Sequence, residues 1–477
     1  MNTWMPALLI TALSAMMLTA VRSEDAINVG SRLEPFVDDY LIERMDGVEL
    51  RLQHPVPRET VITFDAPWEG DTSAYVTVFK DGDRYRMYYR GSVGDSGHQE
   101  VTCTAESADG IHWTKPKLGL FEVAGTKENN VVWIVKGGHA FAPFKDPNPN
   151  AKSEELYKAV APASGDGKTS ILNAYVSPDG YHWKQLGAEP IITDGNFDSQ
   201  NLAFWDAERK EYACYYRAFR NGVREIKRAT SKDFTHWTPG EWVTYNLAPE
   251  QYYTNAITPY FRAPHIYVGF PKRFVPDRKA VESHAFPGVS DGVFISSRDG
   301  LIFHKWLEAF HRPGLDQENW TDRNNMAAWG ILELTPGEIS IYYSQHYRHP
   351  TNGMVRTTIR TDGFVSVHAG SKAGEMVTKP VILLPPADGI PPTTGEGKEL
   401  VINYSTSAVG GVQVEIEDAD GKPIPGFALD DCPIIYGDEI ERVVKWKSGS
   451  DLSSLTGKPV RLRFRLSDAD LYSIRFR

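Results

Sequence analysis

Apolar and polar residues alternate in short stretches along most of the chain. Two such stretches joined by a polar turn occupy residues 74–90, 202–218 and 326–344. A period of two residues is typical of strands that bury one face, whereas helical periodicity is weak and indicates a helical turn or two only at 153–159. The pattern therefore predicts an all-β protein.

A short motif, Ser-x-Asp-Gly-x-x-Trp, marks a repeat within this pattern. Each copy follows an alternating stretch, and the copies, some of them variant, begin at Ser107, Ser177, Ser231, Ser297 and Thr361. In the motif, Asp-Gly supplies a tight turn and the tryptophan begins the next strand. Four strands in each of five units predict a five-bladed β-propeller over residues 50–372. The alternative is a β-sandwich with fortuitous turns.

The repeat does not extend to the ends of the chain. After a proline-rich stretch, residues 373–477 alternate without the motif and predict a C-terminal β-sandwich. Residues 24–49 predict N-terminal strands, and the alternating segment 33–53 either closes the ring or joins the sandwich. Residues 1–23 hold an apolar run too short to span a bilayer, with small residues at its end, which predicts a cleaved signal peptide and secretion.

Composition narrows the possible functions. The chain has 477 residues and a net charge of −11, which argues against a nucleic-acid partner because such a partner needs a basic face. Three cysteines cannot form a disulfide framework. No zinc or phosphate-loop motif occurs, so we expect no metal and no other cofactor. We also expect no membrane association after signal cleavage, and the sequence does not indicate an oligomeric state.

The geometry of a propeller predicts where a site forms. The first strand of each blade lines the axis, so its entrance and the loop after the second strand meet on one face. Acidic residues occur at these entrances, and the candidate catalytic groups are Asp71, Asp146, Asp198 and Glu250. Hydrolysis of a glycosidic bond needs two opposed carboxyl groups, although any single one of these also suits a turn or a cap.

The return loops carry the opposite charge. Their cations, which include Arg224, Lys272 and Arg348, suit an anionic ligand such as a uronate or a sulfated sugar; alternatively they pair with the entrance carboxylates or face water. Aromatic residues at the entrances can stack on sugar rings. The candidate substrate-binding residues are Trp68, Arg90, His98, His139, Gln200, Arg217, Tyr252, Tyr253, Arg273, His284, Trp320, Asp322, Arg323 and His346.

These features together resemble the five-bladed propeller glycosidases, the superfamily of glycoside hydrolase families 32, 43, 62 and 68. The resemblance rests on five blades, the repeated hairpin motif, the trailing sandwich and the sequence Phe144-Lys-Asp-Pro147. It implies a base or nucleophile at Asp71 and an orienting residue at Asp146. Where those families have a glutamic acid in blade three, this chain has Asp198, and Glu250 of blade four is the second candidate for the acid.

The chain looks closest to an uncharacterised secreted bacterial branch, which implies a periplasmic or extracellular location. The resemblance implies a glycoside hydrolase that cleaves a polysaccharide or oligosaccharide by paired carboxylates, with an anionic sugar as one candidate. Two alternatives stay open. One is a phosphorylase resembling family 130, in which basic loops bind inorganic phosphate. The other is a carbohydrate-binding propeller that has lost its catalytic acid.

Overall fold

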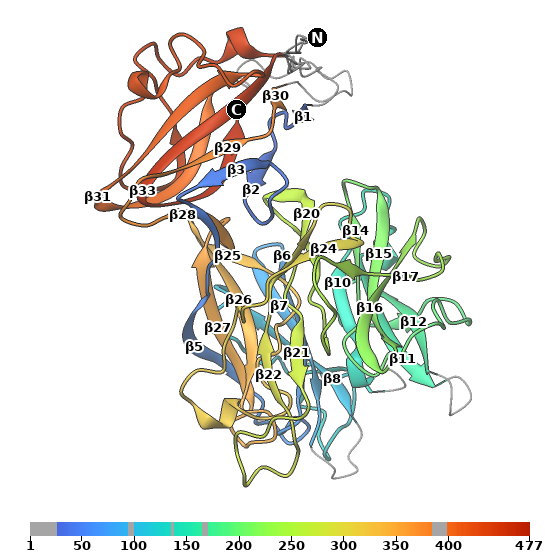
Figure 1. Ribbon diagram of the computed structural model, residues 1–477. Coiled ribbons are helices and arrows are strands. Elements are labelled where there is room, and N and C mark those ends of the chain that lie inside the picture. Colours follow the sequence, from blue (N-terminus) through green and yellow to red (C-terminus); the bar gives the residue numbers. More distant parts are fainter. Residues whose placement is uncertain (1–25, 94–99, 135–137, 165–169, 384–397) are drawn as a thin grey trace, which may run out of the picture.

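The protein is described here by a computed structural model that covers residues 26–93, 100–134, 138–164, 170–383 and 398–477. Five blades stand around a common axis, and a second β unit lies at one end of them (Figure 1). The prediction of an all-β protein with a five-bladed propeller is confirmed. The helical elements within the covered ranges are single 3-10 turns: η2 (Gly138–Ala140), η3 (Ser153–Glu155), η4 (Gln317–Asn319), η5 (Leu429–Asp431) and η6 (Ser453–Leu455).

Blades one to three are antiparallel four-stranded sheets whose strands follow chain order from the axis outwards. Blade one holds β6 (Ala74–Asp81), β7 (Arg84–Gly91), β8 (Val101–Ser107) and β9 (Val131–Trp133). Blade two holds β10 (Ala142–Lys145), β11 (Tyr157–Ser164), β12 (Ser170–Ser177) and β13 (Lys184–Gln185). Blade three holds β14 (Leu202–Asp206), β15 (Glu211–Arg220), β16 (Val223–Ser231) and β17 (Glu241–Trp242).

Blade four departs from this plan. It holds β19 (Thr258–Tyr260), β20 (Ala263–Gly269), β23 (Ile295–Ser297) and β24 (Ile302–Lys305), with β18 (Thr244–Tyr245) added in parallel at its outer edge. Between β20 and β23 the chain also forms a separate hairpin, β21 (Lys272–Val275) and β22 (Val289–Gly292). This hairpin extends from the end of the propeller that is remote from the second β unit (Figure 1).

The ring is closed by a strand from the N-terminal side of the chain. Blade five holds β25 (Leu332–Thr335), β26 (Glu338–Gln345) and β27 (Gly353–Arg360), and its outer strand is β5 (Val56–Thr63). Because β5 directly precedes blade one, its pairing with β27 ties the first blade to the last. The N-terminal strand thereby covers an edge of blade five that would otherwise be open.

Both ends of the chain build the second β unit, in which β33 is the central strand. Its core contains Val414, Trp446, Leu462 and Phe464, all buried. The segment 33–53 therefore joins this unit rather than closing the ring. The strands are β1 (Ile27–Asn28), β2 (Leu33–Pro35), β3 (Ile42–Asp46), β4 (Glu49–Leu52), β28 (Val365–Ala369), β29 (Gly374–Thr378), β30 (Val381–Ile382), β31 (Leu400–Asp418), β32 (Asp438–Val443) and β33 (Pro459–Phe476).

The repeated motif joins neighbouring blades as well as turning the chain. Its glycine carbonyl accepts a hydrogen bond from a buried tyrosine of the preceding blade at three of the five blade junctions. The bonds run from Tyr88 to Gly180 at 2.9 Å, from Tyr215 to Gly300 at 2.7 Å and from Tyr342 to Gly110 at 2.6 Å. The Tyr342 bond connects blade five to blade one, so the motif also helps to close the ring.

The variant copy in blade three shows how this contact can change. Phe234 stands where most copies have glycine and adopts a φ of 69°. Its ring lies 5.8 Å from that of Phe144 and packs in a core with Val160, a residue of blade two. An aromatic side chain thus fills the space between blades two and three that a tyrosine hydroxyl bridges elsewhere.

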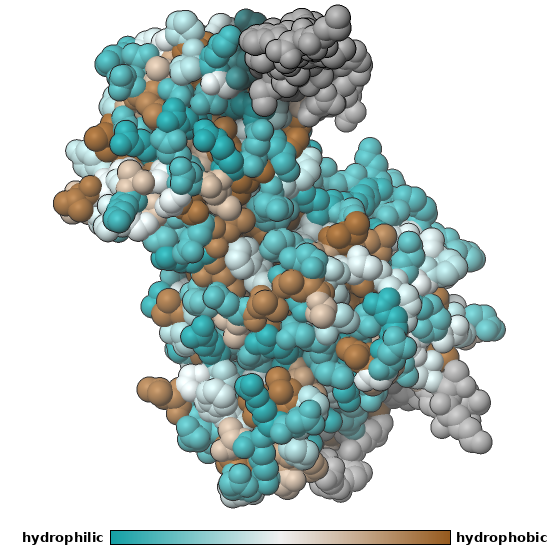
Figure 2. Space-filling view, in the orientation of Figure 1, coloured by the Kyte–Doolittle hydropathy of each residue, from teal (hydrophilic) through white to brown (hydrophobic). Residues whose placement is uncertain are grey.

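The two ends of the propeller are therefore different surfaces. The motif turns lie at the end that carries the second unit, where Arg298 binds Glu34 at 2.8 Å and Asn403 donates to the Thr361 carbonyl at 2.8 Å. The entrances and return loops form the other end, which we call the open face (Figure 1). The side of the molecule in Figure 2 is mostly hydrophilic, with apolar residues scattered over it. Among the described residues, no helix has the length and apolar character needed to cross a membrane.

Candidate functional site

A pocket of about 570 Å³ lies on the open face, between blades three to five. Asp198, before β14, and Arg323, before β25, come from blade entrances, as does Tyr253, which precedes β19. Arg217 of β15 and Arg348, just after β26, come from second strands and their return loops. Entrances and return loops thus meet around one cavity. The aromatic residues that line it are Phe197, Phe219, Tyr253, Phe274 and Phe286.

Positive charge exceeds negative charge in this pocket. Four arginines line it, but only two carboxylates do, Asp198 and Asp322. Arg217 forms an ion pair with Asp198. Asp322 accepts from His284 at 2.9 Å and lies 3.4 Å from Arg348 and 3.6 Å from Arg323.

The remaining arginine of the pocket, Arg224, has no carboxylate partner among the residues that the structure describes, and its Nε atom is buried without a hydrogen-bond partner there. Its guanidinium donates instead to the amide oxygen of Gln251 at 3.2 Å. In a protein with a net charge of −11, the pocket concentrates cations against the overall trend. A cavity with this balance favours an anionic ligand.

Tyr253, which lines the pocket, also belongs to a buried group of tyrosines. Tyr75, Tyr253 and Tyr347 share one buried cluster. The guanidinium of Arg90 lies 4.7 Å from the centre of the Tyr75 ring and donates to the Tyr347 hydroxyl at 3.1 Å. Tyr75 adopts a φ of 56°, a left-handed conformation that is unusual for an aromatic residue and that aims its side chain into the cluster.

The electrostatic surroundings separate two of these tyrosines. Burial raises the pKa of Tyr75 well above its usual value. Burial acts on Tyr253 in the same direction, but the charges of Arg323 and Arg217 and a hydrogen bond with Tyr75 outweigh it and lower the pKa of Tyr253. Burial also lowers the pKa of Lys272, whose amine lies 4.2 Å from the centre of the Tyr253 ring.

Several predicted site residues lie in or directly beside this pocket. Asp198, Arg217, Tyr253, Asp322 and Arg323 line it, and His284 binds Asp322 from behind. A further group surrounds Tyr75: Arg90 contacts its ring, and His139 lies 5.6 Å from it, ring centre to ring centre, while bonding Glu100 at 2.7 Å.

Asp71 lies near the same cavity but is not part of its lining. Its backbone carbonyl accepts from the amide of Arg348, a lining residue, at 2.6 Å. Its Oδ1 atom is buried without a hydrogen-bond partner.

The structure corrects the position of Asp146. We expected it at the entrance of blade two, but it follows β10 and therefore lies at the motif-turn end, whereas His139 precedes β10 and marks the entrance. Asp146 accepts from Tyr212 at 2.6 Å and from Lys158 at 2.9 Å, and its carboxylate is buried. Asp146 and Asp198 thus lie at opposite ends of the propeller, which separates Asp146 from the open-face pocket.

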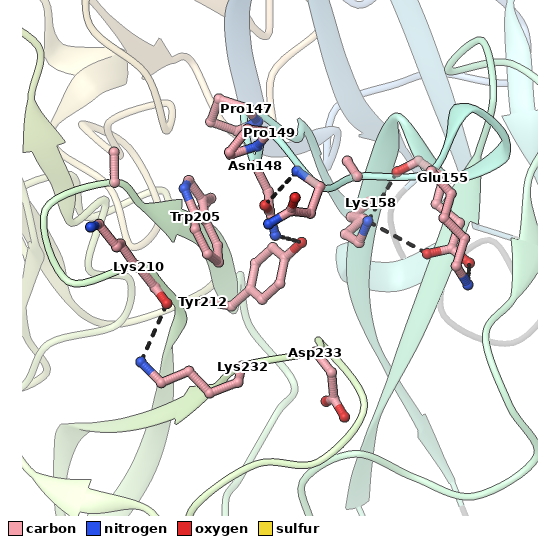
Figure 3. Close-up of a pocket in the computed structure, with 14 residues that line it drawn as sticks. Pro147, Asn148, Pro149, Glu155, Lys158, Trp205, Lys210, Tyr212, Lys232 and Asp233 are labelled. Carbon is pink, nitrogen blue, oxygen red and sulfur yellow. Dashed lines mark hydrogen bonds and ion pairs between the residues drawn. The ribbon is translucent and has the colours of Figure 1, made fainter.

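A second cavity, of about 630 Å³, lies beside Asp146 at this opposite end. Figure 3 shows Trp205, Tyr212 and Lys158 around it, together with the loop that starts at Pro147. Asn148 donates to the hydroxyl of Tyr212 at 2.9 Å, so the loop is fixed to blade three. Phe144-Lys-Asp-Pro147 therefore contributes to the contact between blades two and three.

Other predicted residues also lie outside the open-face pocket. Glu250 and Arg273 bind each other at 3.2 Å, and Glu250 also binds Lys305 at 3.1 Å. Tyr252 is buried against Tyr245. His98 falls outside the described residues.

The remaining predicted residues bond to groups elsewhere in the fold. The partners are Asn130 for Trp68, the Val76 carbonyl for Gln200, the Gly314 carbonyl for Trp320 and Asp316 for His346.

Four residues that line the open-face pocket were not among the predicted substrate-binding residues. Phe274 and Phe286 lie on the β21–β22 hairpin and its loop, a segment inserted into blade four that the repeat pattern does not contain. Arg224 and Arg348 belong to return loops rich in cations, so charge was the available signal, but it does not single them out.

Asp316, Glu318 and His346 place ligand atoms within 4.8 Å of one another. Both acids are exposed, and His346 already bonds Asp316 at 2.8 Å, so we assign no metal there.

No protein-family model and no curated protein matches this chain. Solved structures similar to it include glycoside hydrolases. A fructofuranosidase of Schwanniomyces occidentalis complexed with fructosylnystose is 11% identical with a TM-score of 0.41, over 88% of this chain and 97% of that one.

A thermostable family-43 glycoside hydrolase is 13% identical with a TM-score of 0.42, over 64% of this chain and 96% of that one. An N-acetylgalactosamine deacetylase of F. plautii, in complex with blood group B trisaccharide, is 12% identical with a TM-score of 0.43, over 67% of this chain and 96% of that one.

Proposed function

We propose that this protein is a glycoside hydrolase whose substrate carries an anionic group, and that the reaction takes place in the open-face pocket. The observation that carries the proposal is the content of that one cavity: four arginines, two carboxylates and aromatic walls. Arginines provide forked donors for a carboxylate or a sulfate, and aromatic rings provide flat surfaces for a sugar.

The anionic group would bind where cations lack carboxylate partners. Arg224 fits this role best, because the amide oxygen of Gln251 is the one hydrogen-bond acceptor that its guanidinium contacts among the described side chains, and no carboxylate pairs with it there. Arg323 and Arg348 share the single carboxylate of Asp322, so they too can bind a second anion. A uronate or a sulfated sugar would satisfy these donors through charge-assisted hydrogen bonds.

Hydrolysis of a glycosidic bond needs an acid for the leaving oxygen and a base or nucleophile for the other half of the reaction. Two carboxylates usually supply this pair, and Asp198 and Asp322 are those that line the pocket. Their environments differ, since the Asp198 side chain is 74% exposed and that of Asp322 only 8%. Different environments allow two carboxyl groups to take different roles.

The test is to incubate the full-length protein with matched neutral, uronate-containing and sulfated oligosaccharides and to measure new reducing ends. We expect release only from charged members, and about a 10²–10⁴-fold lower kcat in Asp198→Asn or Asp322→Asn. Glu308→Gln, an exposed change outside the pocket, is the control and should keep full activity.

Two outcomes would replace this proposal. Release of a sugar phosphate that depends on inorganic phosphate would make the protein a phosphorylase. Binding of the charged members without turnover would make it a carbohydrate-binding propeller.

We also propose that the protein is exported, since residues 1–23 have the pattern of a cleaved signal peptide. These residues lie outside the described ranges. The N-terminal sequence of the protein purified from its native host tests this, and an N-terminus that retains residues 1–23 would contradict it.

A further inference from the structure

Tyr253 occupies an unusual position in the open-face pocket because cationic side chains surround its ring. Lys272 lies 4.2 Å from the ring centre, Arg217 5.4 Å, Arg323 5.5 Å and Arg224 5.7 Å. These residues come from separate segments of blades three to five, so the cluster is built by the tertiary fold. Arginines stay protonated in proteins, so at least three of the four groups are lasting positive charges.

The neighbouring tyrosine provides an internal comparison. Tyr252 precedes Tyr253 in the chain but points into a different environment, against Tyr245 and the carboxylate of Glu250, whose Oε2 lies 3.4 Å from its hydroxyl. A carboxylate disfavours a phenolate, whereas arginines favour one. Two adjacent tyrosines are thus placed in opposite electrostatic surroundings.

The two pocket carboxylates are poorly placed to accept a proton. Asp198 is ion-paired with Arg217, and Asp322 is bonded to His284 and flanked by two arginines. Paired carboxylates have their lone pairs engaged, which weakens each of them as a proton acceptor. The efficiency of a general base is greatest when it titrates near the working pH, which a stabilised phenolate can approach from above.

We propose that Tyr253 is the general base of the open-face pocket. This inference rests on the proposed function and assigns one of its two proton transfers. The Tyr253 phenolate takes a proton from water as the water oxygen bonds to the anomeric carbon. The bond from that carbon to the glycosidic oxygen breaks, and the leaving oxygen keeps the electron pair and takes a proton from the group that serves as the acid in the proposed function. That group then takes a proton back from solvent. Tyr253 then returns its proton to solvent.

The lowered pKa of the Tyr253 hydroxyl agrees with a role as general base. The causes that lower the pKa of Tyr253, against burial, are the charges of Arg323, Arg217 and Arg90 and a hydrogen bond with Tyr75. Tyr75 stays protonated because burial raises its pKa, so it can donate to the phenolate. The other groups that face Tyr253 are Lys272 and Arg224, and the nearby carboxylates of Asp198, Asp322 and Glu100 each bind a cation.

Ionisation can be measured without any substrate. Phenolate absorbance near 295 nm is titrated in the full-length wild type, in Tyr253→Phe and in the matched control Tyr252→Phe. We expect one phenolate to form below the ordinary tyrosine pKa of about 10 in the wild type and in Tyr252→Phe, and to be lost in Tyr253→Phe. Superimposable curves for the wild type and Tyr253→Phe below pH 10 would overturn the proposal.

Activity provides the second measurement, on the charged oligosaccharide that the wild type cleaves. Tyr253→Phe removes only a hydroxyl, and we expect kcat to fall about 10²–10⁴-fold with little change in KM. Arg224→Gln removes one positive charge beside the ring, so the rise of kcat/KM with pH should move to higher pH. A wild-type kcat in Tyr253→Phe, or an unmoved profile in Arg224→Gln, would contradict the assignment.

The two proposals fail in distinguishable ways. If Tyr253→Phe keeps full activity while Asp198→Asn and Asp322→Asn lose it, the base assignment is wrong and the hydrolase proposal stands. If the wild type cleaves no member of the panel, the hydrolase proposal fails, and the base assignment fails with it whatever the absorbance titration shows.

Discussion

The two ends of the propeller use the same residue types for different purposes. At the motif-turn end, an aspartate stands at the end of each inner strand of blades one to three or directly after it, and a tyrosine of the following blade binds it. The pairs are Asp81 with Tyr157, Asp146 with Tyr212 and Asp206 with Tyr267. Each of these aspartates also binds a cation, so the carboxylates there are neutralised in blade-to-blade contacts.

At the open face, cations outnumber carboxylates. Tyrosines such as Tyr253 lie against arginines instead of carboxylates, and the two pocket carboxylates are outnumbered by four arginines. The end of the strand on which an aspartate lies thus decides whether it joins blades or lies at the open-face pocket. The comparison separates the aspartates of the motif-turn end, which stabilise the ring, from the carboxylates of the open-face pocket, which are the candidates for catalysis.

Replacing Asp146 should give the largest effect on stability. Asp146→Asn removes the nearer of the two carboxylates that pair with the buried Lys158 amine, the other being Glu155 at 3.7 Å, and we expect the free energy of unfolding to fall by roughly 3 kcal/mol. Denaturant titration measures this. Asp198→Asn is the matched control on the open face: its carboxylate is exposed although its partner Arg217 is buried, so the loss should be less than about 1 kcal/mol. Equal losses in the two variants would contradict the distinction between the ends.

Much of the fold could be predicted because its signals are local. The alternation at 74–90 and 202–218 corresponds to β6–β7 and β14–β15, and the motif copies correspond to turns after third strands. The pairing of β5 with β27 was not accessible, because the sequence of β5 indicates a strand but not its partner. The helical turns indicated at 153–159 are one 3-10 turn followed by β11.

The site was harder to predict than the scaffold. Asp146 was misplaced because the apolar run before it does not alternate, so nothing local shows that β10 begins at Ala142 rather than after Pro147. A shift of a few residues moves a side chain from one end of a short strand to the other. The contacts between Tyr253 and Arg323 join residues 70 positions apart, which only the closed ring brings together.

Replacing the motif glycine Gly180 at its contact with blade one should lower the free energy of unfolding by less than Asp146→Asn does. At Gly180, φ is +80°, and a Cβ atom would lie 2.1 Å from the Arg86 guanidinium and 2.5 Å from the Tyr88 hydroxyl. We expect Gly180→Ala to lose about 1–3 kcal/mol of unfolding free energy more than Gly119→Ala. Gly119 has a similar φ of +71° but nothing within 4 Å, so it reports the backbone cost alone. Thermal unfolding of both variants measures the difference, and equal losses would mean that the turn does not pack against blade one.

The smallest expected effect is a pH-dependent contribution of Asp179, in the motif turn of blade two, to the free energy of unfolding. Partial burial would raise the pKa of Asp179, but hydrogen bonds from the backbone and ring of His182 lower it to about 2. Because this is below the unfolded value of 3.8, the carboxylate stabilises the fold fully above pH 3.8, and that contribution is lost as the pH falls towards 2. Solvent screening limits the contribution to at most about 1 kcal/mol. The difference in unfolding free energy between the wild type and Asp179→Asn should therefore shrink between pH 4 and pH 2. A constant difference over that range would show that the charge of Asp179 contributes nothing to the turn.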